Sequence, residues 1–305
     1  MCFKIWIDTT GPHLYRMFCQ TQENYKIDTG LRASPYHEDN LSFPNFEKPT
    51  TLGFFSVTPE RNYEPTARNL RYYKAPTSFP FDLNIGAPLA IKKPGSFYDE
   101  DINHLLTFIS DYKAQFLRPA DQTTKPGIAA EFICWSGLLR LLMCTPYELR
   151  KDWCIHVTKY FDTFYLCKRD SKNDQHQLRK VNVEQKRMKA WGHKFEQYCL
   201  SDSPLIEPNA SAPVDECAEF CCVFKSKVKG MEILYGSKME GIISDKPVQF
   251  NENNNNLQNL KFVELKVRQA DLNRRQQQFY KRFKTRNWWC QSFLVGVQDL
   301  YVGRR

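Results

Sequence analysis

The chain has 305 residues, enough for one large domain or two ordinary ones, with a formal net charge of +9 and an aromatic content of 14%. No apolar run reaches membrane-spanning length and no signal-peptide pattern opens the sequence, so we expect neither an integral membrane protein nor a secreted one. The basic balance and the many aromatic rings favour a polyanionic partner, with a merely soluble basic protein as the alternative.

Residues 1–40 are polar, and we expect them to pack loosely. Residues 41–305 are expected to form a single domain. Aromatic pieces punctuated by proline at 43–94 indicate short strands and turns. Helices with an apolar side are expected at 99–116, 129–144 and 183–200, and a basic, Gln-rich helix is expected at 271–283. Strands are expected at 153–166, 220–228, 231–243, 262–266 and 292–297, with an Asn-rich loop at 251–256.

The eleven cysteines are scattered along the chain and do not show the spacing of a disulfide framework, which predicts reduced thiols in a nuclear or cytosolic protein. The closest group, Cys217, Cys221 and Cys222, lacks the second Cys or His pair that zinc spacing requires. We therefore expect no zinc site.

The strand at 262–266 carries a carboxylate and an ammonium two residues apart, in Glu264 and Lys266. Side chains alternate along a strand, so both point to the same face. Buried charge is costly unless it is paired or holds a metal. The pattern is typical of metal-dependent nucleases, in which the carboxylate binds Mg²⁺ or Mn²⁺ and the Lys steadies water or phosphate. An ordinary cross-strand ion pair is the alternative.

Two further carboxylates are candidates for the same metal. Glu240 lies within the strand predicted at 231–243, on the other side of the Asn-rich loop, and Glu196 lies on the predicted helix at 183–200. Three convergent carboxylates suit an octahedral Mg²⁺ or Mn²⁺. In the alternative interpretation, Glu196 is an exposed helix residue and Glu240 an exposed strand residue.

Several motifs occur together and in a fixed order: F-I-C-W-S-G-L-L at 132–139, M-C-T-P-Y-E at 143–148, G-H-K-F-E at 192–196, E-L-K at 264–266 and W-W-C-Q-S-F-L-V-G at 288–296. With L-G-F-F-S at 52–56 and L-R-Y-Y at 70–73, they resemble the DXO/Rai family of RNA 5′-end decapping nucleases. The resemblance implies an α+β fold with two curved mixed β-sheets flanked by helices around a central pocket.

The resemblance also implies the activity of this family, which acts on the 5′ ends of RNA. Its members remove triphosphate, incomplete or NAD caps from RNA, some digest RNA from the 5′ end, and they use a divalent metal. The resemblance implies RNA 5′ ends as the substrate, a nuclear location with the cytoplasm as a further compartment, and a 5′–3′ exonuclease or another nuclear RNA-processing protein as a partner. No membrane partner is implied.

The family's functional residues can be carried over position by position. The metal ligands fall on Glu196, Glu240, Glu264 and Leu265. The catalytic positions fall on Lys266, Glu264 and Glu240. The substrate-binding positions fall on Gln291 and Ser136.

Two of these motifs depart from the family's pattern. Lys238 stands where the E-x-D motif has a Glu, and Glu240 replaces its Asp. A unit charge about 5 Å from the metal, with an effective dielectric constant near 20, costs about 3 kcal/mol, so this reversal of charge weakens a metal site. Ser136 replaces an Arg that contacts RNA phosphates in the family, and Ser has no guanidinium group to bind a phosphate through two hydrogen bonds. Arg140, one helical turn later, is the alternative contact.

Two functions follow from these observations. The first is a divergent metal-dependent 5′-end nuclease with weakened activity, and the second is a pseudo-nuclease that binds or protects 5′ ends and recruits partners, as in the Cutoff-like branch of the family. Family members also continue beyond the last shared motif, so we expect the C-terminal part of the fold to be missing. The basic segment at 268–286 is either an RNA track, a solvated helix face or a nuclear import signal.

Overall fold

The computed structural model describes residues 2–8, 16–20, 24–28, 45–86, 89–95, 100–118, 127–147, 152–180, 182–250 and 257–305. The Asn-rich loop predicted at 251–256 lies outside these residues. The chain divides into two compact units. Unit 1 comprises Met1–Pro49, Asp101–Lys180 and Lys225–Tyr235, and unit 2 comprises Thr50–Glu100, Val181–Phe224 and Gly236–Arg305.

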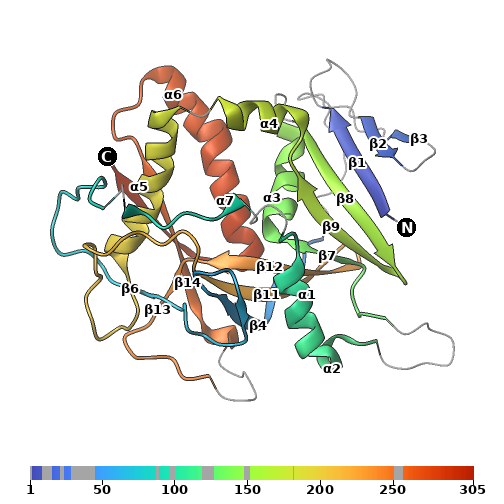
Figure 1. Ribbon diagram of the computed structural model, residues 1–305, viewed down its shortest axis with the longest axis horizontal. Helices are drawn as coiled ribbons and strands as arrows, with labels where there is room; N and C mark the ends of the chain where they lie inside the picture. Colours follow the sequence, from blue (N-terminus) through green and yellow to red (C-terminus); the bar gives the residue numbers. More distant parts are fainter. Residues whose placement is uncertain are drawn as a thin grey trace. The chain divides into compact units, whose positions relative to one another are not determined.

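Unit 1 combines a mixed sheet with short helices (Figure 1). Its elements are β1 (Cys2–Asp8), β2 (Arg16–Gln20), β3 (Asn24–Asp28), α1 (Asn103–Asp111), α2 (Lys113–Phe116), β7 (Phe132–Trp135), α3 (Ser136–Cys144), β8 (Trp153–Tyr160), β9 (Thr163–Arg169) and α4 (Lys172–Arg179). The strands pair in the order β3-β2-β1-β8-β9-β7, followed by the part of β12 that belongs to this unit. β8 and β9 are antiparallel, whereas β7 and β9 are parallel.

The predicted helix at 129–144 is wrong in its first half. Residues Phe132–Trp135 form β7, which pairs with β9 through Phe132 opposite Phe164. The four residues are aromatic or short apolar side chains, and Ile133 and Cys134 are fully buried in the sheet. An apolar run of this kind has no periodicity that separates a buried strand from a buried helix. The helix α3 therefore begins only at Ser136.

Unit 2 contains parts of two mixed sheets. Its elements are β4 (Thr50–Val57), β5 (Tyr63–Glu64), β6 (Tyr72–Tyr73), α5 (Val183–Cys199), β10 (Leu200–Ser201), β13 (Gly241–Ile243), β14 (Lys261–Arg268), α6 (Arg274–Phe279), α7 (Thr285–Val295) and β15 (Asp299–Arg304), with most of β11 (Glu219–Val228) and the end of β12 (Met231–Met239). One sheet has the order β12-β11-β4-β5, and the other has the order β10-β6-β13-β14-β15. β14 is antiparallel to β13 and parallel to β15.

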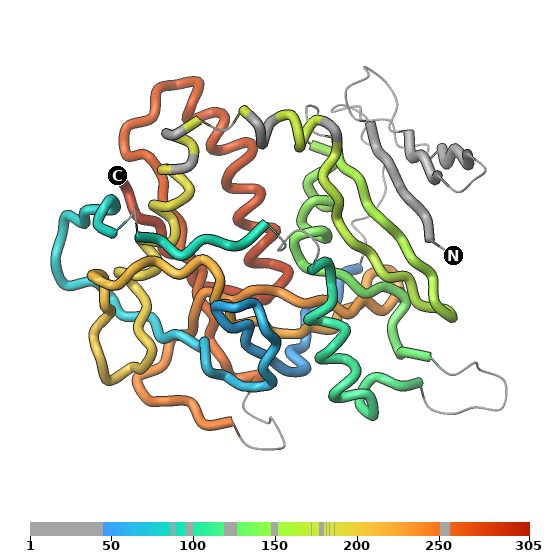
Figure 2. The backbone as a smooth tube through the Cα atoms, in the orientation of Figure 1, coloured from blue at the N-terminus to red at the C-terminus, as the bar shows by residue number. Residues whose placement is uncertain are grey.

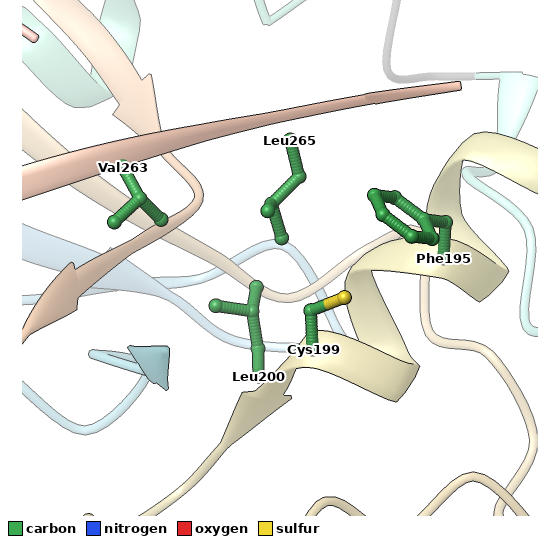
Figure 3. Packing of buried hydrophobic residues seen from close by; sticks show 5 residues of the cluster. All are labelled: Phe195, Cys199, Leu200, Val263 and Leu265. Carbon is green, nitrogen blue, oxygen red and sulfur yellow. The ribbon is translucent and has the colours of Figure 1, made fainter. Parts of the chain in front are cut away.

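Helix α5 covers one face of β14. The helix begins at a capping box, in which the Asn182 side chain accepts from the backbone N–H of Gln185 and the Gln185 side chain accepts from that of Asn182. Phe195 and Cys199 of α5 pack with Leu200 against Val263 and Leu265 of β14 (Figure 3). Because side chains alternate along a strand, Glu264 and Lys266 point to the opposite face of β14.

The last two predicted elements are also revised. The basic helix predicted at 271–283 begins at Arg274, after the cap Asn273, and continues through a π-helix at Tyr280–Lys284 into α7 (Figure 2). The strand predicted at 292–297 is wrong, because residues up to Val295 belong to α7. The final strand is β15, which pairs with β14 instead.

The structure confirms the α+β class and the two mixed sheets expected from the sequence. Cys217, Cys221 and Cys222 are free thiols, as expected, and no cluster of three His, Cys, Asp or Glu residues suited to a metal occurs in the described ranges. Across those same ranges, every helix is too short or too polar to cross a lipid bilayer.

Candidate functional site

Lys266 joins two carboxylates in unit 2. Its Nζ donates to Glu264 Oε1 on the same strand and lies 3.1 Å from Glu240 Oε1. The side chain of Glu264 is only 4% exposed and that of Lys266 is 17% exposed. The E-x-K pattern thus forms a buried cluster of opposite charges, as the spacing predicts.

Glu240 lies between β12 and β13 and is fixed by the neighbouring strand. Its Oε1 accepts from Lys266 and its Oε2 accepts from the backbone N–H of Leu265. The next residue, Gly241, is opposite Val263 in the sheet. A Cβ on Gly241 would lie 2.7 Å from a Leu200 methyl group and 2.9 Å from the Arg71 carbonyl oxygen. The close strand approach that places Glu240 over β14 therefore requires glycine at 241.

Glu196 belongs to α5, and His193 is its neighbour one turn earlier. His193 Nδ1 lies 3.5 Å from Glu196 Oε2. Burial raises the pKa of Glu196, but the hydrogen bond with His193 and the positive charge of Lys238 outweigh burial and hold the pKa below its usual range. Glu196 is thus kept ionised beside the other two carboxylates.

The charges of the cluster act on one another. Burial, with repulsion from Glu196 and Glu264, raises the pKa of Glu240 well above its usual range. Desolvation lowers the pKa of Lys266, but attraction to Glu240 and Glu264 outweighs it and raises the pKa. Three carboxylates therefore lie within electrostatic reach of one another, and Lys266 compensates only part of their negative charge.

Lys238 is a second cation beside these carboxylates. Desolvation lowers its pKa, but attraction to Glu196, Glu219 and Glu240 outweighs this effect and raises the pKa. Its side chain remains accessible to solvent. The departure noted in the sequence thus places an ammonium within electrostatic reach of Glu196 and Glu240, and of a further carboxylate, Glu219, that sequence reasoning missed.

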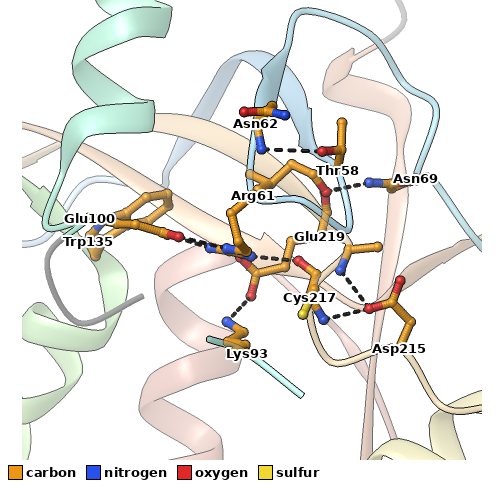
Figure 4. Close-up of polar contacts among 12 residues, drawn as sticks. Thr58, Arg61, Asn62, Asn69, Lys93, Glu100, Trp135, Asp215, Cys217 and Glu219 are labelled. Carbon is orange, nitrogen blue, oxygen red and sulfur yellow. Dashed lines mark hydrogen bonds and ion pairs between the residues drawn. The ribbon is translucent and has the colours of Figure 1, made fainter. Parts of the chain in front are cut away.

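Glu219 belongs to a buried polar network (Figure 4). Arg61 Nη1 lies 2.9 Å from Glu219 Oε2, and Lys93 Nζ lies 2.6 Å from Glu219 Oε1. Arg61 also pairs with Glu100 at 2.7 Å. Glu219 is the first residue of β11, and Arg61 and Lys93 reach it from distant parts of the sequence, so no local pattern marks it as a site residue.

The predicted substrate contacts are on two helices, α3 and α7. Ser136 is the first residue of α3 and belongs to unit 1, as does Arg140. Gln291 lies on α7 in unit 2 and, as far as the structure describes the chain, forms no hydrogen bond with the carboxylate cluster. The substrate-binding roles of Ser136 and Gln291 stay predictions.

The cluster can be tested as a holder of a divalent metal. Carboxylate oxygens are the ligands that Mg²⁺ and Mn²⁺ prefer, and the raised pKa of Glu240 reflects a negative charge that a cation would relieve. Against this, no three such donors among the described residues converge on one point, and the Leu265 N–H and Lys266 occupy both oxygens of Glu240. The chemistry of these carboxylate donors fits a divalent cation, but the Glu240 side chain must first release its hydrogen bonds with Leu265 and Lys266.

A cavity of about 190 Å³ opens beside Glu196. Its walls include His193, Arg71, Asp202 and Glu207, so acidic groups outnumber the single Arg. Among the cluster residues, Glu196 contributes to the lining, so the cavity exposes this carboxylate to molecules from solution.

Comparison with known proteins identifies the family. Residues 47–305 match the model of the RAI1-like PD-(D/E)XK nucleases. The chain is 33% identical over 269 residues to "Decapping and exoribonuclease protein Rai1" of Drosophila melanogaster, covering 87% of this chain and 71% of that protein. It is 27% identical over 287 residues to "Protein cutoff" of the same organism, covering 92% of this chain and 71% of that protein.

Solved structures agree on the fold. The crystal structure of Candida albicans Rai1 in complex with pU5-Mn²⁺ superposes with a TM-score of 0.71 at 19% identity, over 86% of this chain and 70% of that one. At this identity the likeness concerns the fold alone. From the family match and the Drosophila relative, the chain belongs to the RAI1-like PD-(D/E)XK nuclease family.

Proposed function

We propose that this protein processes RNA 5′ ends by metal-dependent hydrolysis and that Lys238 weakens this activity. The observation that carries the proposal is the cluster of Glu196, Glu240, Glu264 and Lys266 in one unit of a nuclease-family chain. The substrates are those of the family, which are triphosphate, NAD or incompletely capped 5′ ends. A nuclear location and a 5′–3′ exonuclease or other RNA-processing partner belong to the same proposal and rest on the resemblance alone.

In this mechanism Glu196, Glu240, Glu264 and the Leu265 carbonyl would hold Mg²⁺ or Mn²⁺. A metal held by these residues would supply a water molecule of lowered pKa and would neutralise charge on the phosphate. Lys266 has three N–H donors, of which Glu240 and Glu264 take two. Its third donor is directed to the attacking water or to the phosphate, and the two carboxylates hold the ammonium in position.

Lys238 acts against this chemistry in two ways. Its ammonium attracts Glu196 and Glu240 and so competes with a metal for the same carboxylates. It also adds a positive charge that repels a divalent cation. Both effects lower metal affinity without removing a carboxylate, so we expect slow hydrolysis rather than none.

Binding of 5′ ends without hydrolysis is the second candidate function. It is favoured by the absence of three converging donors in the described part of the chain and by the ammonium of Lys238 beside the acids. In this case the cluster is held together by its own lysines, and the protein acts by occupying RNA ends.

The deciding experiment incubates the purified protein with 5′-triphosphate, NAD-capped and 5′-monophosphate RNAs in Mg²⁺ or Mn²⁺. Glu264→Gln removes a cluster carboxylate, and Glu184→Gln, at an exposed position of α5, is the matched control. We expect metal-dependent product from the wild type and from Glu184→Gln, and none from Glu264→Gln. Binding of 5′ ends with no product in either metal would select the second candidate.

A further inference from the structure

Unit 2 contains a basic helical segment from Arg274 to Val295, which consists of α6, the π-helix and α7. Residues 272–298 contain no Asp or Glu. The six Lys and Arg residues of the segment are Arg274, Arg275, Lys281, Arg282, Lys284 and Arg286. A helix with this composition attracts a polyanion along its length.

Most of these cations face water. Lys281, Arg282 and Lys284 are exposed, and within the described residues none of them forms an ion pair with a carboxylate. Lys266 and Lys238, by contrast, are both attracted to carboxylates of the cluster. The positive charge of these three residues is therefore available to a partner. In an ordinary solvated helix, neighbouring carboxylates would neutralise much of this charge.

Aromatic rings flank the basic residues. The rings of Phe279 and Phe283 lie 5.0 Å apart, and those of Trp289 and Phe293 are stacked 4.9 Å apart. Phe279 is 54% exposed and Trp289 is 55% exposed. These two exposed rings are ten residues apart on one continuous helical segment, and Lys281, Arg282 and Lys284 lie between them in the sequence.

We propose that this segment is a track for single-stranded RNA that binds the body of the RNA independently of its 5′ end. Flat rings stack on unpaired bases of any sequence, and the intervening cations contact phosphates. Paired bases are not free to stack in this way, so the occupant is a single strand. The inference goes beyond the proposed function because it requires no 5′ end and no hydrolysis.

A short circular oligouridine tests the track, because it has no 5′ end to enter a catalytic site. Its affinity for the full chain is measured over a series of salt concentrations. One variant combines Lys281→Ala, Arg282→Ala and Lys284→Ala, and the matched control combines Lys48→Ala, Lys92→Ala and Lys246→Ala, three exposed lysines outside the segment. Trp289→Leu tests stacking separately, and circular dichroism verifies that each variant is folded.

We expect the circular RNA to bind the wild type and the control variant alike. The segment variant should lower the slope of log affinity against log salt by about 2, at about 0.7 per lost phosphate contact. Trp289→Leu should weaken binding about five-fold or more. Equal losses in the control and segment variants would overturn the track in favour of general charge attraction. Binding of 5′-triphosphate RNA without binding of the circle would also overturn it, while leaving the proposed function intact.

Discussion

Lys266→Met is expected to destabilise unit 2 strongly. The substitution keeps an unbranched side chain of similar length but removes the ammonium that joins Glu240 to Glu264. Both carboxylates then remain buried without that cation, where burial and repulsion from Glu196 and Glu264 already raise the pKa of Glu240. The free energy of unfolding should fall because buried charges without partners are costly.

The size of the effect follows from the geometry. Lys266 Nζ and Glu240 Oε1 are 3.1 Å apart, and the two side chains are 17% and 10% exposed, so water screens them little. At this distance and an effective dielectric constant of about 20, Coulomb's law gives about 5 kcal/mol. Desolvation of the ammonium offsets part of this attraction. Loss of one partner of a buried pair costs about 3–5 kcal/mol, and we expect about 3 kcal/mol here.

Urea unfolding followed by Trp fluorescence measures this loss. Lys261→Met, at the exposed first residue of the same strand, is the matched control and should change stability little. Adding Glu264→Gln to Lys266→Met removes one of the two unpaired charges and should recover part of the stability. A loss below about 1 kcal/mol for Lys266→Met, as for an exposed ion pair, would refute the reasoning. So would a double variant no more stable than the single one.

Two further predictions concern the packing and the electrostatics of unit 2. A Cβ on Gly303 of β15 would lie 2.8 Å from the Phe195 ring, so Gly303→Ala should lower stability by about 1–3 kcal/mol in thermal melts. Gly192→Ala, which meets no atom within 4 Å and lies inside α5, should be neutral or stabilising, and equal losses for the two variants would contradict the packing argument. Burial raises the pKa of Glu219, but its cationic neighbours outweigh burial and lower it. This group stabilises the fold above its ordinary pKa, and the contribution is lost as pH falls through the lowered folded value. Unfolding measured over acidic pH should therefore show a flatter pH dependence for Glu219→Gln than for the wild type, and equal slopes would show that Glu219 contributes nothing.

Much of the site could be predicted because its elements carry strong local signals. The helix expected at 183–200 matches α5 closely, since it combines a capping box with apolar spacing. The alternation in β14 correctly placed Glu264 and Lys266 on one face. Glu240 lies beside them because β13 and β14 are antiparallel neighbours in the sheet, and strands that follow one another in the chain often pair.

The remaining features depend on contacts distant in sequence. β7 is a strand because β9 pairs with it, and the apolar run itself is compatible with either structure. Residues 292–295 are helical because they extend a helix that starts before them, whereas their β-prone side chains alone favour a strand. Arg61 and Lys93 approach Glu219 only through the tertiary fold, so no spacing in the sequence indicates that network.

The central claim is that an intact carboxylate cluster is weakened by the charge of Lys238. Its most direct test is the rate at which 5′-triphosphate RNA is hydrolysed in Mn²⁺ by the wild type, Lys238→Gln and Lys238→Glu. Each step removes one unit of positive charge from beside Glu196 and Glu240. We predict that the rate rises from wild type to Lys238→Gln to Lys238→Glu, by about tenfold or more overall, and that adding Glu264→Gln abolishes it. A rate for Lys238→Glu no higher than that of the wild type would contradict the claim.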